Sequence, residues 1–433
     1  MTTHNLKPTF VVSGIVVLTL IFWLLSYPHS TFRHHTDDPF LIYSSQLLGI
    51  TGFCLFSLSF ILSARIKWVE NYFGGLDKMY HLHHTLGKVA FFLLLIHPML
   101  LAARWVPDNL KKVSWYLFPV HKHMEINLGS WSLLGLTLLI IFTLIIKIPY
   151  DKWKITHKFT GLFFLLGVLH IFMLDSFITD HPALASYLLL FSLAGIGAFL
   201  YKSVFYNLLA KKHYYSVQNI HRMNGNVMEI NLIPKKNKLT FIPGQFCFFK
   251  FINKEITKET HPFTLCSAAD NDGIGILVKT LGDYTNNLYK KLTENTTAVI
   301  DGPFGQFNYQ QGMPNQIWIA GGVGVAPFVS WIRNISKKDV LDYNINFYYC
   351  VRNRADGIYI EEFQEMERKT QNFKFHLVCS KEKGHLKVSD LQDIQTNSIF
   401  ICGPKKLRTS LVKDLKKLKI PSSHLYYEDF DFL

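Results

Sequence analysis

The sequence predicts a membrane α-helical bundle of six transmembrane helices, followed by an antiparallel β-barrel domain and an α/β domain. Three observations predict this order. The 433 residues are 49% hydrophobic with a mean hydropathy of +0.16, which is high for a soluble protein. The long apolar runs all lie in the first half of the chain. The second half instead alternates short strand-like runs with glycine, proline and helical segments.

Six apolar runs are each near the length that a tilted helix needs to cross about 30 Å of hydrocarbon. They cover residues 10–25, 41–63, 84–103, 130–147, 158–176 and 183–205. Only Lys7 precedes the first run as a cation, and no small-residue cleavage pattern follows it. We therefore expect a retained helix rather than a cleaved signal peptide.

The basic residues of the loops predict how the helices are oriented. One side of the membrane receives Arg65, Lys67, Lys78, Lys147, Lys152, Lys154, Lys158, Lys202, Lys211 and Lys212, and the other receives Arg33, Arg104, Lys111, Lys112 and Lys122. The richer side is expected to be cytoplasmic, together with both termini. This topology explains most of the net charge of +14, and nothing indicates nucleic-acid binding. We expect a multi-pass protein of the lipid bilayer, in a bacterial inner (cell) membrane.

Histidines bracket two of the apolar runs. His83 and His97 are fourteen residues apart, which on a helix is roughly 21 Å of rise and about 40° short of whole turns, so both rings share a face. His157 and His170 bracket the second run. Two such helices can hold two metals at two depths, and facing imidazoles are what a bis-histidine haem requires.

Two features of the histidine pattern qualify this interpretation. Glycine follows the first histidine of each run by four residues, at Gly87 and Gly161. However, the thirteen residues between His157 and His170 leave their side chains about 140° apart on an ideal helix. Either that helix contains a π-bulge or similar irregularity, or the pairing is wrong. The alternative is that such histidines are hydrogen-bonded packing residues or part of a proton path.

The cysteines exclude two other classes of metal site. Six cysteines occur at positions 54, 247, 266, 350, 379 and 402, and the chain has no CxxC pair. An iron–sulfur cluster or a structural zinc site is therefore not expected.

Strand-like runs at residues 214–217, 227–232, 245–251 and 274–280 predict the barrel. From about residue 316, the runs IWIA, INFYYCVR, FKFHLVCS and SIFICGP alternate with or precede helical segments at 327–335, 361–369 and 405–418. This alternation predicts a parallel nucleotide-binding sheet.

Seven short motifs occur in this second half. They are HPFTLCS (261–267), KTLGDYT (279–285), DGPFG (301–305), GGVGVAP (321–327), YCVR (349–352), FICGP (400–404) and YEDFDF (427–432). Together they resemble the ferredoxin reductase-like module of the NADPH oxidase and ferric reductase superfamily. That family also carries six transmembrane helices with haem histidines on the third and fifth. The resemblance divides the chain into a transmembrane di-haem domain (1–210), an FAD-binding β-barrel domain (211–312) and an NAD(P)H-binding α/β domain (313–433).

The resemblance implies two sets of flavin contacts. The strand and its extension would face the isoalloxazine ring with His261, Pro262, Phe263, Thr264, Leu265, Cys266 and Ser267. Lys279, Gly282 and Thr285 would approach the flavin pyrophosphate, as a cation, an open backbone and a hydroxyl donor. The alternatives are an ordinary barrel strand and a plain turn.

GGVGVAP lies between a strand and a helix, where backbone amides and a helix N-terminus can meet a dinucleotide pyrophosphate. The resemblance implies that the nicotinamide nucleotide site is formed by Gly321, Gly322, Gly324 and Pro327, with Cys402, Gly403 and Pro404 beside the nicotinamide. Arg352, with Arg354 close by, favours the 2′-phosphate of NADPH over NADH. The alternative is a solvated surface arginine.

The C-terminal aromatic residues suit a ring stacked on the flavin, as in the family, and Phe432 is preferred to Phe430. Core packing is the alternative for them. Cys402 and Phe432 are the residues that we expect to act at the reacting rings.

The function that the resemblance implies is electron transfer from cytoplasmic NADPH through FAD and two b-type haems to oxygen, giving superoxide. The inner haem would be held by His83 and His157, and the outer haem by His97 and His170. Arg104 lies just beyond His97, where it could attract an anionic acceptor or superoxide, or simply snorkel to the interface. A ferric-chelate reductase, or a redox partner that passes electrons to quinone or another protein, remains as the alternative function.

Overall fold

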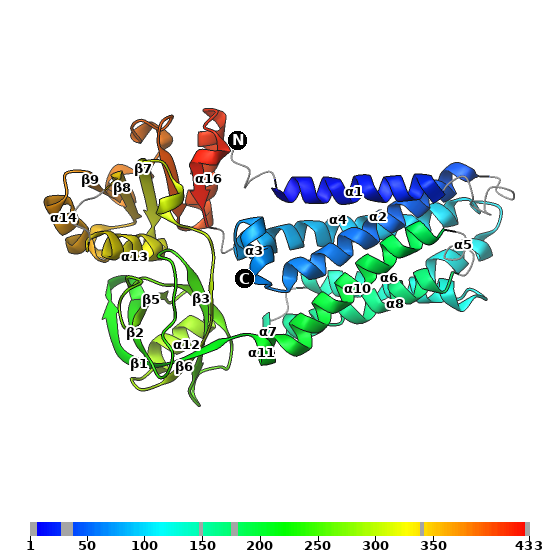
Figure 1. Ribbon diagram of the computed structural model, residues 1–433, viewed down its shortest axis with the longest axis horizontal. Coiled ribbons are helices and arrows are strands. Elements are labelled where there is room, and N and C mark those ends of the chain that lie inside the picture. Colours follow the sequence, from blue (N-terminus) through cyan, green and yellow to red (C-terminus); the bar gives the residue numbers. More distant parts are fainter. Residues whose placement is uncertain (1–6, 27–37, 147–149, 175–180, 338–341, 429–433) are drawn as a thin grey trace. The chain divides into compact units, whose positions relative to one another are not determined.

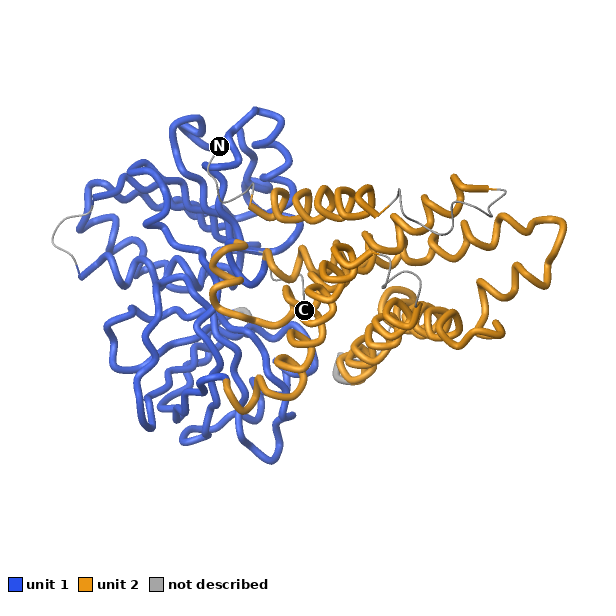
Figure 2. The backbone as a smooth tube through the Cα atoms, turned by 45° about the vertical axis from the view of Figure 1, so that its right-hand side comes forward, with its two compact units in different colours: residues 1–5, 74–77, 210–433 blue, residues 6–73, 78–209 orange. Residues whose placement is uncertain are grey.

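The computed structural model describes residues 7–26, 38–146, 150–174, 181–337 and 342–428. These residues form two compact units, which are coloured separately in Figure 2. Of the described residues, one unit comprises those between 7 and 73 and between 78 and 209, and the other comprises 74–77 and those between 210 and 428.

The first unit is a bundle of apolar helices that lie alongside one another (Figure 1). Six helices in the described part of the chain are long and apolar enough to cross a membrane: Lys7–Ser26 (α1), Pro39–Ser63 (α2), Leu76–Ala103 (α4), Met124–Leu144 (α6), Lys152–Phe172 (α7 and α8), and Pro182–Leu209, which begins with α10 (Pro182–Leu200). Backbone hydrogen bonds within a helix pair its interior amides and carbonyls, which the apolar interior of a membrane requires. The prediction of six transmembrane helices is confirmed. Two shorter helices, Lys67–Phe73 (α3) and Leu110–Leu117 (α5), lie in the connections.

The fifth span is interrupted directly after its first histidine. Helix α7 (Tyr150–His157) ends at His157, and α8 (Thr160–Phe172) begins three residues later. Between them, the amides of Lys158, Phe159 and Gly161 donate to carbonyls three residues back, at 3.0–3.2 Å. Such i→i+3 bonds wind the chain more tightly than an α-helix does. The irregularity that the thirteen-residue spacing requires is therefore present, as a tight turn and not as a π-bulge.

A π-helical turn does occur in the sixth span. It covers Tyr201–Phe205 (η3), between α10 and the short helix Tyr206–Leu209 (α11). Elsewhere in the bundle, Phe164 of α8 packs face to face on Phe53 of α2, with ring centroids 5.2 Å apart. A Cβ atom on Gly195 of α10 would lie 2.7 Å from the Phe164 ring, so this glycine allows α10 to pack closely against Phe164.

The second unit begins with a six-stranded antiparallel sheet. Its strands are Lys212–Met223 (β1), Val227–Pro234 (β2), Phe246–Ile252 (β3), His261–Thr264 (β4), Ile274–Lys279 (β5) and Thr297–Phe304 (β6), in the spatial order β4-β3-β6-β1-β2-β5. A bridge between Leu265 and Ile276 joins the two ends of this order and closes the sheet into a barrel. Helix Asp283–Lys291 (α12) follows β5.

A five-stranded parallel sheet follows the barrel. Its strands are Asn315–Gly321 (β7), Asn344–Val351 (β8), Phe373–Cys379 (β9), Ser398–Cys402 (β10) and Leu425–Tyr427 (β11), in the order β11-β10-β7-β8-β9. Helices Ala326–Ile335 (α13), Ile360–Lys369 (α14) and Lys405–Lys417 (α16) connect or flank them. The strand order reverses between β7 and β10, and ligands of such sheets bind outside the carboxyl ends of the strands at this point. The predicted fold class is confirmed in all three parts.

Candidate functional site

His83 of the third span and His157 of the fifth span, the first histidine of each span, face each other. The ring centroids of His83 and His157 are 6.3 Å apart, and the ring planes are nearly perpendicular at 83°. With metal–nitrogen bonds of about 2.0–2.1 Å on each side, two imidazoles that share one metal have centroids roughly 6.4 Å apart. The spacing of this pair therefore fits a metal held between the two rings.

Three of the four histidines are fixed by the same backbone contact. Nδ1 of His83 donates to the Ser59 carbonyl at 2.9 Å, Nδ1 of His97 to the Ser45 carbonyl at 2.9 Å, and Nδ1 of His170 to the Glu125 carbonyl at 2.7 Å. A hydrogen on Nδ1 leaves the Nε2 lone pair available, which is the tautomer that a metal-ligating histidine needs.

His157 is held differently. Its ring stacks on Trp153, with centroids 5.0 Å apart and planes at 25°. Its Nδ1 atom is buried and has no hydrogen-bond partner in the described part of the chain. The Trp153 indole therefore orients the His157 ring by stacking, whereas a hydrogen bond to a backbone carbonyl orients each of the other three histidines.

Two glycines of neighbouring helices make room for His97 and His170, the second histidine of each span. The sequence analysis did not identify these glycines. A Cβ atom on Gly49 of α2 would lie 2.9 Å from Nδ1 of His97, and one on Gly129 of α6 would lie 3.0 Å from Nδ1 of His170. Each glycine follows the residue whose carbonyl accepts the histidine bond by four positions, which are Ser45 and Glu125. In an α-helix the amide of residue i+4 lies beside the carbonyl of residue i, so a missing side chain there exposes the carbonyl to a second donor. The sequence did contain a signal for these two sites. In each case a glycine follows a small or polar residue by four positions, at the depth of a histidine on another span.

The two glycines that the sequence does single out have other surroundings. A Cβ atom on Gly87 would meet only Ser59 Oγ, at an ordinary 3.9 Å. A Cβ atom on Gly161 would lie 2.3 Å from the Phe199 ring, so this glycine lets α8 and α10 pack together.

The histidine arrangement suits a haem better than a bare ion. Among the described residues there is no group of three or more histidine, cysteine, aspartate or glutamate side chains that could hold a metal. A haem iron needs only two axial ligands from the protein, because its porphyrin supplies the other four. The paired rings and their ordered tautomers therefore fit this group.

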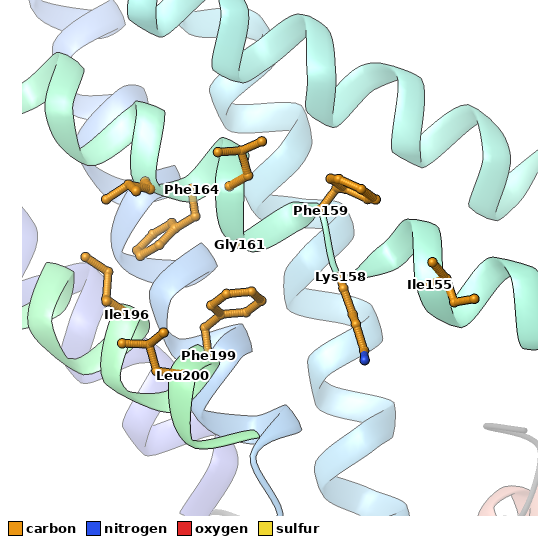
Figure 3. A pocket seen from close by; sticks show the side chains of 10 residues that line it. Ile155, Lys158, Phe159, Gly161, Phe164, Ile196, Phe199 and Leu200 are labelled. Carbon is orange, nitrogen blue, oxygen red and sulfur yellow. The ribbon is translucent and has the colours of Figure 1, made fainter. Parts of the chain in front are cut away.

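A cavity of about 520 Å³ lies beside the break in the fifth span (Figure 3). Its lining comes from α7, α8 and α10 and includes Phe159, Gly161, Phe164 and Phe199. Lys158 is the one charged residue in this lining, and none of the four histidines contributes to it. The cavity thus offers apolar surface and no group for redox chemistry.

The proposed flavin strand divides into an accessible and a buried part. The β4 residues His261, Pro262, Phe263 and Thr264 are half-buried and retain exposed surface. Leu265 and Cys266 have no exposed surface and Ser267 has 5%. Leu265 packs in the barrel core, whereas Cys266 packs in the core of the nucleotide domain, so the assignment of Leu265, Cys266 and Ser267 to the flavin stays a prediction.

His261 is engaged by its neighbours. Its ring stacks on Tyr284 with centroids 3.7 Å apart, and its Nε2 atom lies 2.8 Å from Glu259 Oε2. Burial raises the pKa of the Tyr284 hydroxyl above its ordinary value, so the stacked pair carries no phenolate at neutral pH. The ring of His261, at the start of β4, is therefore held in place by Tyr284 and Glu259.

The turn after β5 differs from expectation at one residue. Lys279 ends β5, and Gly282 is the N-cap of α12. The Thr285 hydroxyl accepts from the amides of Leu281 and Gly282, at 2.9 and 3.1 Å, and donates to the Gly282 carbonyl. The hydroxyl therefore holds the turn and is not a free donor for a phosphate. The backbone at Gly282 is open, since a Cβ atom there would meet nothing within 4 Å.

The two glycine loops of the nucleotide domain lie against each other at the reversal of strand order. A Cβ atom on Gly324 would lie 2.6 Å from the Cys402 carbonyl oxygen, and one on Gly403 would lie 2.9 Å from the Gly321 backbone. Gly322 has a φ of +53°, which L side chains rarely adopt. The structure thus brings the predicted residues of both loops together, including Pro327 in the first turn of α13 and Pro404 beside Gly321.

Cys402 is 4% exposed, and burial raises the pKa of its thiol well above the usual value. It borders the loop as a neutral group. Arg352 follows β8, the neighbour of β7, and its side chain is exposed. Phe430 and Phe432 lie outside the described residues, so their stacking on the flavin stays a prediction.

Three family models match the chain in order. Residues 48–168 match a ferric reductase like transmembrane component, 213–320 an FAD-binding domain, and 318–413 an oxidoreductase NAD-binding domain. The chain is 24% identical over 213 residues to one component of the Na(+)-translocating NADH-quinone reductase of Pseudoalteromonas atlantica, which covers 43% of this chain and 52% of that protein. It is also 24% identical over 236 residues to the reductase component of the propane 2-monooxygenase of Rhodococcus jostii, which covers 49% of this chain and 62% of that protein. The chain therefore spans between half and two thirds of the length of these relatives.

Solved structures also match the second half of the chain. The FAD/NAD-binding domain of a nitric oxide dioxygenase from Vibrio cholerae aligns with 18% identity and a TM-score of 0.44, over 50% of this chain and 98% of that one. The Amycolatopsis cytochrome P450 reductase aligns with 20% identity and a TM-score of 0.44, over 51% of this chain and 70% of that one.

Proposed function

We propose that this chain, a ferric reductase-like transmembrane component fused to a ferredoxin reductase-type FAD and NAD(P)H module, carries electrons from NADPH across the membrane through FAD and two b-type haems. It is a multi-pass membrane protein and an NAD(P)H oxidoreductase. In the orientation that the basic loops favour, the reductase module and both termini are cytoplasmic, in a bacterial inner membrane.

The observation that supports this function most directly is the histidine arrangement. His83 and His157 face each other at a spacing that suits a shared metal. His97 and His170 each donate from Nδ1 to a backbone carbonyl, and a glycine of the same neighbouring helix lies against each ring. Two histidine levels on the same two spans suit a path across the bilayer.

When bound, the flavin would take up hydride from the nicotinamide and the haem irons would pass single electrons onward. The chain's own residues have the tasks of binding and orientation. The loops at Gly324 and Gly403 pack backbone against backbone, with no side chain between them. The amides of the turn between β7 and α13 would bind the pyrophosphate. Arg352 is the residue that we assign to the 2′-phosphate of NADPH. The four histidines would hold the two haem irons, and the carbonyls of Ser45, Ser59 and Glu125 keep three of the imidazoles in the tautomer that leaves Nε2 free to ligate.

Oxygen is the acceptor that we propose, with superoxide as the product. Support comes from Arg104, whose guanidinium lies 5.5 Å from the Trp105 ring and 5.9 Å from the Tyr116 ring. Its Nε atom is buried without a hydrogen-bond partner in the described part of the chain, so it is available to an anion. The match to a ferric reductase-like component favours a ferric chelate as the second candidate, and the relative named as an NADH-quinone reductase favours quinone.

The test uses the protein purified in detergent. We expect a b-type spectrum with two haems per chain, and we expect His97→Ala and His170→Ala to lose one haem while NADPH still reduces the flavin. His84→Ala is the matched control, because this histidine is on the same helix with an exposed side chain. A His97→Ala protein with an unchanged haem-to-protein ratio would overturn the ligand assignment. Superoxide production, measured with and without a ferric chelate, then distinguishes the acceptors.

A further inference from the structure

Helix α13 is bonded directly to the barrel by three successive contacts. Ser330 Oγ donates to the Ser267 carbonyl at 2.7 Å, and Trp331 Nε1 donates to the Pro243 carbonyl at 3.0 Å. Both side chains are fully buried. The third contact is an ion pair, in which Arg333 Nη1 lies 3.0 Å from Glu229 Oε1 on β2. The flavin and nucleotide domains are therefore joined through the second half of this helix.

Arg333 is the residue in this interface that contacts several elements at once. The Nε and Nη2 atoms donate to the two carboxylate oxygens of Glu362 on α14, at 2.9 and 3.1 Å. Its Nη1 atom also donates to the Cys266 carbonyl at 3.2 Å, and its guanidinium lies 4.8 Å from the ring centre of Tyr359. One guanidinium thus connects two elements of the nucleotide domain with two elements of the barrel.

The two ends of these connections lead to the two candidate ligand sites. The last two residues of the GGVGVAP motif, Ala326 and Pro327, form the start of α13, so Arg333 lies on the helix that continues directly from this loop. Cys266 and Ser267, whose carbonyls accept from Arg333 and Ser330, directly continue the proposed flavin strand β4. A shift of α13 against the barrel would therefore change the separation of the nicotinamide and flavin rings.

We propose that Arg333 is a positioning residue for hydride transfer, which holds the nucleotide-binding loop at a fixed distance from the flavin strand. The inference rests on the transfer of hydride from NAD(P)H to the flavin, and not on the haems or the final acceptor. Hydride transfer requires the two reacting atoms to approach to about 3–3.5 Å, and a misplacement of about 1 Å can cost roughly a hundredfold in rate.

Arginine suits this position because of the shape of its side chain. Its planar fork binds the Glu362 carboxylate along one edge and still presents Nη1 to Glu229. The Glu229 and Arg333 side chains are 11% and 24% exposed, so water competes weakly for their charges. Lysine would keep the charge but has a single nitrogen, which cannot serve the two carboxylates in this geometry.

The experiment measures single-turnover reduction of the flavin by saturating NADPH, in the full-length protein in detergent. For Arg333→Lys we expect the rate constant to fall about ten- to a hundredfold. The NADPH dissociation constant and the FAD content should stay within about twofold, because neither predicted ligand site is altered. NADPH deuterated at the transferred position should show a primary isotope effect on the slowed step.

Two further variants keep the inference testable. Lys337→Gln is the matched control, because Lys337 also joins the end of α13 to the barrel, at 2.6 Å from Asp270 Oδ1, but with both side chains largely exposed. Exposed pairs contribute little, so its rate constant should stay near that of the wild type. Glu229→Gln removes the barrel-side charge at almost constant shape, and it serves if Arg333→Lys does not fold.

The results separate a positioning role from a structural one. Slowed hydride transfer with intact FAD and NADPH binding, in Arg333→Lys or in Glu229→Gln, supports the inference. The inference is overturned if the rate constant is unchanged in both variants. It is also overturned if the decrease is explained by lost FAD or weaker NADPH binding, or if Lys337→Gln shows the same decrease. The measured quantity is the rate of flavin reduction, which does not depend on the haems. A negative result for Arg333 is therefore distinguishable from a negative result for the proposed transmembrane path.

Discussion

Substitution of Gly49 by alanine tests the outer haem site without altering a ligand. The added Cβ atom would lie 2.9 Å from His97 Nδ1, whereas ordinary contacts begin at 3.4 Å, so the ring must retreat by about 0.5 Å. Such a retreat lengthens the bond from His97 Nδ1 to the Ser45 carbonyl from 2.9 Å toward about 3.4 Å, beyond the range of a good hydrogen bond. Gly129→Ala should act in the same way on His170.

The expected magnitude follows from the role of that bond. Loss of the contact that orients a metal-ligating histidine typically costs 10- to 100-fold in metal affinity, or about 1.4–2.7 kcal/mol. Helix destabilisation would not explain such a loss, because alanine is about 1 kcal/mol better than glycine inside a helix. We therefore expect the dissociation rate of one of the two haems to rise about 10- to 100-fold. The midpoint potential of the same haem should rise, since its imidazole loses basicity.

The assay is haem transfer to an excess of an apo-haem protein, followed by absorbance, with a redox titration of the same preparations. Gly87→Ala is the matched control, because it makes the same change on α4 and its Cβ atom would meet only Ser59 Oγ at 3.9 Å. Equal haem dissociation rates and equal potentials in Gly49→Ala and Gly87→Ala would refute the role of the glycine.

The remaining predictions concern the reductase module. Arg352→Ala should raise the KM for NADPH about ten- to a hundredfold and leave that for NADH nearly unchanged, because it removes one charge-assisted phosphate contact; equal effects on both nucleotides would contradict this role. Gly282→Ala should weaken FAD binding without straining the turn, because its φ of −155° suits alanine and the methyl group meets no protein atom; unchanged FAD affinity would mean that the flavin does not approach this backbone. Gly324→Ala should weaken NADPH and NADH binding alike, since its Cβ atom would lie 2.6 Å from the Cys402 carbonyl; unchanged affinity for both would show that the loop can shift freely. Alkylation of Cys402 at pH 7 should be slow, because burial keeps its thiol protonated; rapid labelling in intact protein would contradict the buried thiol.

Some of the predicted site residues are placed as the sequence implies, and others are not. The glycines at 321, 322 and 324 and the segment 402–404 converge because each ends a strand beside the reversal of strand order, which the alternation of strands and helices already implies. Leu265 and Cys266 look equivalent to Thr264 in a motif, but only the packed structure shows that Leu265 lies in the barrel core and Cys266 in the core of the nucleotide domain. Thr285 likewise appears to be a free donor until the turn that it caps is seen.

The sequence by itself determined the six apolar spans, the barrel and parallel sheet that follow them, and which four histidines lie toward the ends of two of these spans, because these properties depend on local composition and on spacing along the chain. Only the tertiary structure decided how the histidines are held. The carbonyls of Ser45, Ser59 and Glu125, and the glycines Gly49 and Gly129, come from spans other than those of the histidines that they contact. The Arg333 contacts have the same origin, since they join residues 29 to 104 positions apart. Helical periodicity describes one element at a time, and such contacts exist only once elements distant in sequence have packed together.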